Sequence, residues 1–125
     1  MRSADVDTLL EATAHPCIAV IDSIREELLA APGVLETIKW KAPNYALADD
    51  FATMSLRRPQ AVQLILHTGA KPKPEHPEID LGELPAFARR ADRNRVVLTF
   101  VSATLSEDDR LTLRRMISDW IAQLA

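Results

Sequence analysis

The sequence predicts an α+β fold, in which an antiparallel sheet of about five strands is covered on one face by N- and C-terminal helices. Helical spacing of apolar residues is confined to the two ends of the chain, at about 4–30 and 106–124. The middle holds short apolar runs rich in β-branched and aromatic residues, and the connectors between most of them suit antiparallel hairpins. This order is typical of helices packed on one face of an antiparallel sheet. A length of 125 residues fits one domain spanning 1–125.

Two helices are predicted at the start of the chain. The first covers 4–13 and ends before Pro16, because the residue that precedes a proline is pushed out of helical geometry. The second begins near Pro16 and stops at Ala31-Pro32-Gly33. Cys17 fits its apolar stripe, so we interpret it as a buried structural cysteine. The other apolar residues of that stripe recur every three or four positions: Ile18, Ile21, Ile24, Leu28 and Leu29.

The middle of the chain predicts strands at 35–42, 50–57, 61–67 and 95–101, with a further brief strand at 79–85. Pro43 is expected to end the first of them by removing a backbone donor.

A loop and a final helix complete the prediction. Prolines at 72, 74 and 77 favour an extended, solvated loop over 68–78. Ser106 is a suitable N-cap for the last helix, with Asp109 three residues further on. The apolar stripe of this helix consists of Leu113, Met116, Ile117, Trp120, Ile121 and Leu124.

Composition excludes several classes of protein. The chain is 47% hydrophobic and 26% charged, which is ordinary for a soluble protein. Its formal charge of -3 is unsuited to a general nucleic-acid binder, so no nucleic-acid partner is expected. No apolar stretch approaches the ~20 residues of a membrane span, so no membrane partner is expected either. The N-terminus lacks the apolar run of a secretory signal, and a single cysteine fits a reducing cytoplasm.

The most distinctive stretch is 36–45, where a strand pattern meets a tryptophan, a proline and a tyrosine. Alternation puts Trp40 on the apolar face of the strand and Lys39 and Lys41 on the other. Trp40 and Tyr45 either line a ligand cleft whose lysines attract an anion, or Trp40 belongs to the core and the lysines are solvated. Tyr45 is placed in a turn and expected to be partly exposed.

The leading hypothesis is therefore a non-catalytic cytoplasmic domain that binds a small ligand or a partner beside this stretch. Its candidate ligand-binding residues are Lys39, Trp40, Lys41, Tyr45 and Lys71. No nucleophile elbow, Ser-His-Asp order or paired-acid motif is present, so a non-enzyme is expected. A hydrolase or transferase that uses Cys17 or a histidine is the third hypothesis. The arginines at 57, 58, 89, 90, 93 and 95 form either an anion patch or, more simply, a solvated face.

The segment 36–45, Phe51, the turn 69–71 and the closing helix resemble the YdhG-like family of small bacterial domains. The resemblance implies a frataxin-like α+β sandwich. One branch of that family is regarded as a cytoplasmic iron chaperone for iron-sulfur cluster and haem assembly, which gives an alternative function with iron as the cargo. Iron would then bind acidic side chains of the early helices, where Asp22 and Glu26 lie four residues apart on one helical face.

Overall fold

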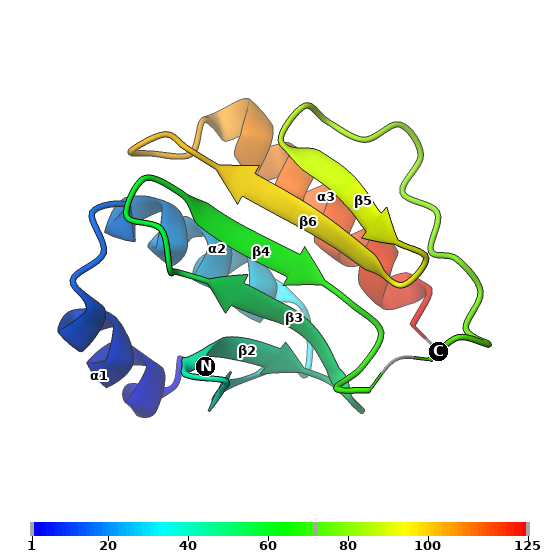
Figure 1. Ribbon diagram of the computed structural model, residues 1–125, viewed down its shortest axis with the longest axis horizontal. Helices are drawn as coiled ribbons and strands as arrows, with labels where there is room; N and C mark the ends of the chain where they lie inside the picture. Colours follow the sequence, from blue (N-terminus) through cyan, green and yellow to red (C-terminus); the bar gives the residue numbers. More distant parts are fainter. Residues whose placement is uncertain (1, 72, 125) are drawn as a thin grey trace.

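The computed structural model describes residues 2–71 and 73–124, and this part of the chain contains three helices and six strands (Figure 1). All neighbouring strands are antiparallel, in the order β1-β2-β3-β4-β6-β5. The α+β class is as predicted. The elements are α1 (Ala4–Thr13), α2 (Ile18–Ala30), β1 (Leu35–Lys39), β2 (Ala42–Ala46), β3 (Asp50–Ser55), β4 (Val62–Leu66), β5 (Ala88–Asp92), β6 (Arg95–Phe100) and α3 (Glu107–Ala122).

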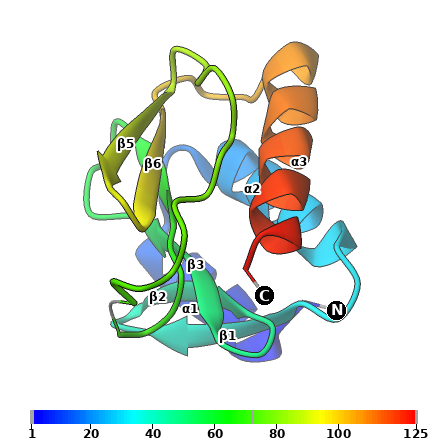
Figure 2. The same cartoon turned by 90° about the vertical axis from the view of Figure 1, so that its right-hand side faces the viewer.

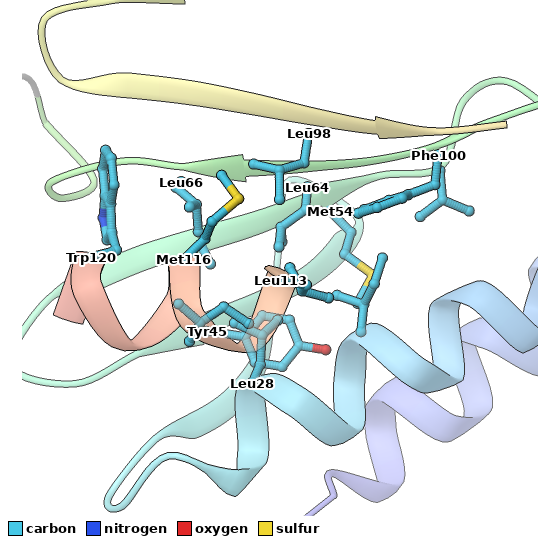
Figure 3. Close-up of a cluster of buried hydrophobic side chains, with 14 of the residues drawn as sticks. Leu28, Tyr45, Met54, Leu64, Leu66, Leu98, Phe100, Leu113, Met116 and Trp120 are labelled. Carbon is cyan, nitrogen blue, oxygen red and sulfur yellow. The ribbon is translucent and has the colours of Figure 1, made fainter. Parts of the chain in front are cut away.

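In residues 2–71 and 73–124, helices α2 and α3 lie on one face of the sheet and no helix covers the other, which we call the helix-free face (Figure 2). The apolar core fills the layer between them, where Leu28 of α2 and Met116 of α3 meet strand residues such as Leu64 (Figure 3). Helix α1 adds Val6 and Leu10 to the same core. Burial of this continuous apolar layer is the dominant stabilising contribution.

The three predicted helices are present and the predicted cap at Ser106 is confirmed, but α2 begins at Ile18, so Pro16 precedes its first turn. The Ser3 hydroxyl accepts a hydrogen bond from the Val6 amide at 3.3 Å, and Ser106 does the same for Asp109 at 3.1 Å. Each cap satisfies an amide that has no partner inside its helix. Cys17 is buried at the start of α2, as expected.

The predicted strand 35–42 is in fact the start of a hairpin. Strand β1 ends at Lys39, a two-residue turn follows, and β2 contains Pro43 opposite Ile38. The prediction that Pro43 ends the ladder is wrong. In a two-residue hairpin the pair that flanks the turn is hydrogen-bonded and the next pair is not. Pro43 occupies that next position, so its missing N–H costs no bond to β1.

The count of about five strands is wrong for two reasons. The sequence correctly predicted the strands seen as β1, β3, β4 and β6, but 79–85 is irregular although Ile79 and Leu81 are buried. Strands β2 and β5 were missed. The segment Ala88–Asp92 lacks β-branched residues and forms an edge strand through its pairing with β6. The predicted loop over 68–78 contains no helix or strand in its described residues, and Pro72 lies outside them.

Candidate functional site

The helix-free face of the sheet carries a pocket of about 550 Å³. Strand β4 explains which residues reach it, because Leu64 and Leu66 point into the core and Ile65 therefore points away from it. His67 follows with the same direction as Ile65. The pocket is lined by Trp40, Thr53, Ile65, His67, Thr68, Gly69, Ala70, Pro74, Asp92, Arg93, Asn94 and Arg95.

Trp40 reaches the pocket from the turn between β1 and β2. Both turn residues have left-handed backbones, with φ of 54° at Trp40 and 59° at Lys41. This is the conformation of a type I′ turn, which usually holds Asn-Gly, and it costs a bulky L-residue roughly 1–2 kcal/mol. The turn leaves 66% of Trp40 exposed. The interpretation of Trp40 as a core residue is therefore wrong.

A chain of polar side chains runs across the sheet to the pocket. Lys39 forms an ion pair with Asp50 at 2.5 Å, and Asp50 accepts a hydrogen bond from the side-chain Nδ2 of Asn44 at 2.9 Å. The Asn44 oxygen accepts from the Thr53 hydroxyl at 2.8 Å, and that hydroxyl oxygen lies 3.0 Å from Nε2 of His67. Asn44 is fully buried, so these partners replace the water that it gives up.

This chain of hydrogen bonds favours one tautomer of His67. The Thr53 hydroxyl has one proton, which it donates to Asn44, so Nε2 of His67 must donate to Thr53. In that tautomer Nδ1 accepts from the Gly69 amide, 3.3 Å away, and also lies 3.1 Å from the Gly69 carbonyl oxygen. Burial lowers the pKa of the imidazole, which keeps the ring neutral. The indole N–H of Trp120 donates to the His67 carbonyl at 2.9 Å and ties this end of β4 to α3.

The β5–β6 hairpin supplies the charged groups of the pocket. Arg95 donates to Asp92 through Nη2 at 2.7 Å and Nε at 2.8 Å, and this hydrogen bonding lowers the pKa of Asp92. Arg93 is exposed and donates from Nε to the His76 carbonyl at 3.2 Å. Asn94 donates to the Lys73 carbonyl at 3.1 Å, which holds the loop against the hairpin.

The three lysines predicted to bind a ligand have different positions. Lys39 is engaged by Asp50. Lys41 is exposed in the turn and does not line the pocket. Lys71 is exposed and directly follows Ala70, which does line it. The fold therefore brings Trp40 and the loop that carries Lys71 to one site.

Tyr45 lies elsewhere. The prediction of a partly exposed turn residue is wrong, because β2 carries Tyr45 into the core, where it is fully buried. Its hydroxyl donates to the Glu36 carboxylate at 2.7 Å, and Glu36 is paired with Arg25 at 2.7 Å. Donation by Arg25, then Tyr45 and the Ser3 amide, keeps the pKa of Glu36 low although burial opposes it.

The two carboxylates predicted for iron are both paired with arginines. Asp22 contacts Arg2, whose hydrogen bond lowers the pKa of Asp22, and Glu26 contacts Arg110 at 2.9 Å. Across residues 2–71 and 73–124, no group of three or more His, Cys, Asp or Glu side chains could hold a metal ion. An iron ion at Asp22 and Glu26 would have to compete with Arg2 and Arg110.

Sequence reasoning missed most of the pocket. Alternation over 61–67 was sufficient to place Ile65 and His67 on the face opposite Leu64. No comparable signal existed for the turn between β5 and β6, because β5 was not recognisable as a strand.

Comparisons of the chain with family models, with curated proteins and with solved structures gave no match. In the described part of the chain, no helix has the length and apolar character needed to cross a membrane.

Proposed function

We propose that this domain binds a small organic ligand, without transforming it, in the pocket beside Trp40. The observation that carries the proposal is the pocket itself, whose volume of about 550 Å³ is within the range of ligand sites. Trp40, Ile65 and Pro74 offer apolar surface, and a few polar groups converge on it. This is the combination expected of a ligand-binding pocket.

The conformation of Trp40 supports a role in binding. A left-handed backbone is unfavourable for a bulky residue, and strained residues cluster at functional sites. The strain holds a large aromatic ring in solvent, where it contributes little to folding. A ligand that covers the ring would recover the apolar burial that the fold leaves unused.

The state of His67 supports binding in preference to acid–base chemistry at this residue. Both of its ring nitrogens already have partners, at Thr53 and Gly69. A general base needs a free nitrogen within reach of the substrate proton. His67 therefore serves as a positioned wall of the pocket.

We further propose the frataxin-like arrangement and YdhG-like membership that the sequence motif implies. An antiparallel sheet with two helices on one face supports this at the level of architecture. A cytoplasmic location is proposed on the single cysteine. The pocket and the arginine-paired acids favour an organic ligand over iron.

Tryptophan fluorescence tests the proposal directly. The chain has two tryptophans, of which Trp120 is buried, so Trp120→Phe keeps an aromatic ring in the core and leaves Trp40 as the reporter. A fragment library is screened for compounds that change Trp40 emission and raise the melting temperature. The same hits are then tested on Trp40→Ala in the otherwise natural chain. We expect that variant to lose the thermal shift and Leu35→Ala, a control at another exposed apolar residue, to keep it. Hits that stabilise Trp40→Ala as well as the natural chain would contradict the proposed site.

A further inference from the structure

The charged groups of the pocket do not balance. Its lining contains two guanidinium groups, from Arg93 and Arg95, and one carboxylate, from Asp92. Arg95 is committed to Asp92 through two hydrogen bonds to one oxygen. With His67 neutral, the lining has a net single positive charge in a chain whose formal charge is -3.

Arg93 is the source of the excess charge. Within residues 2–71 and 73–124, no carboxylate lies within ion-pairing distance of its guanidinium. The bond from Nε to the His76 carbonyl fixes the base of the group and leaves both Nη atoms without a partner in the described residues. Two adjacent Nη donors in one plane match the geometry of a carboxylate or phosphate.

The same pocket contains the exposed indole of Trp40. An indole face packs well against another flat ring, and Ile65 and Pro74 add apolar surface to the same lining. The lining therefore combines a site for a ring with a site for an anion. Lys71, exposed beside the lining residue Ala70, adds positive charge nearby.

We infer that the ligand is a flat organic anion, whose ring contacts Trp40 and whose carboxylate or phosphate binds the Nη groups of Arg93. The inference rests on the proposed function and specifies its ligand class. Arg93 is then the residue that determines specificity, since a neutral ring of the same shape would use Trp40 alone.

Matched probes separate the ring from the charge. Isothermal titration calorimetry of the whole chain at low salt compares 2-naphthoate with 2-naphthamide, and 2-naphthyl phosphate with 2-naphthol. A hydrogen-bonded ion pair predicts that at least one anion binds about tenfold or more tightly than its neutral partner. The tighter anion identifies the headgroup. Raising the salt concentration should weaken the anions selectively, because the exposed guanidinium becomes screened.

Substitutions assign the effect to one residue. Arg93→Ala should reduce the affinity of the anion to that of its neutral partner, and Arg93→Lys should retain part of the preference because it keeps the charge without the fork. Arg115→Ala is the control, since Arg115 is an exposed arginine on α3, across the sheet from the pocket. It should bind both anions as the natural chain does.

Four results would overturn the inference. Neutral probes that bind as tightly as the anions would remove the charge preference and leave the proposed function intact. Equal losses of affinity for the anion in Arg93→Ala and Arg115→Ala would show only a long-range charge effect. If no probe binds while fragments from the earlier screen do, the ligand class is wrong although the pocket is functional. If neither probes nor fragments bind, the proposed function fails as well.

Discussion

Replacing Tyr45 with phenylalanine should lower the free energy of unfolding and leave ligand binding intact. The ring would remain in its core position, and only the hydrogen bond to Glu36, 2.7 Å long, would be lost. Hydrogen bonds to charged groups contribute about 1.5–3 kcal/mol. Glu36 keeps Arg25 and the Ser3 amide as partners, so its charge is not left unpaired. We therefore expect a loss of about 2 kcal/mol, within that range.

Urea denaturation measures this change. With a slope of ~2 kcal/mol per molar urea, the expected loss moves the midpoint down by about 1 M. Trp40→Phe is the control, because its ring is mostly exposed and its midpoint should change little. The assignment of Tyr45 to the core would be refuted by the opposite pattern. In that case Tyr45→Phe would have the urea midpoint of the natural chain but would no longer bind the fragments detected by Trp40 fluorescence.

Three further predictions test the turn, the imidazole and the alternative function. Lys41→Gly should raise the urea midpoint by an amount equivalent to roughly 0.5–1 kcal/mol, because glycine accepts the left-handed backbone without strain; a lower midpoint would contradict the turn conformation. His67 has a folded pKa below its unfolded value of about 6.5, so its contribution to stability is present above that pH and is lost as the pH falls below it. The natural chain should therefore lose more stability than His67→Gln between about pH 7.5 and 5.5, and equal losses would count against the neutral buried ring. On the iron-chaperone alternative, ferrous iron at ~100 times its dissociation constant adds about 2.7 kcal/mol in an anaerobic thermal-shift titration. The double variant Asp22→Asn, Glu26→Gln should lose that gain, and a flat titration of the natural chain would exclude the two carboxylates as an iron site.

The sequence predicted the fold better than the site, and the hairpin at Trp40 explains the difference. Periodicity reports which residues share a face only while one element continues. Type I′ turns are recognisable mainly by Asn and Gly, and the turn at Trp40 and Lys41 has neither. Once the turn was missed, Trp40 was assigned to the wrong environment, and Tyr45 was placed in a turn although it belongs to a strand.

The ion-pair partners of the charged residues could not be predicted, for a related reason. The sequence shows that Arg93 and Arg95 are near Asp92, but only the bend between β5 and β6 decides which arginine takes the carboxylate. Long-range partners such as Arg25 with Glu36 likewise depend on how a helix is placed on the sheet. The helical stripes needed no such information, since spacing alone identifies the buried face.

The polar chain from Lys39 to His67 also has a consequence for the accuracy of folding. Apolar side chains tolerate a shifted strand alignment if their faces are kept, but Asn44 and Asp50 are buried and have specific partners. Sliding β2 by two residues along β3 would keep apolar residues inside. It would leave both buried polar side chains without hydrogen bonds, at a cost of several kcal/mol. The polar contacts on the helix-free face therefore destabilise misaligned sheets that apolar burial in the core would tolerate.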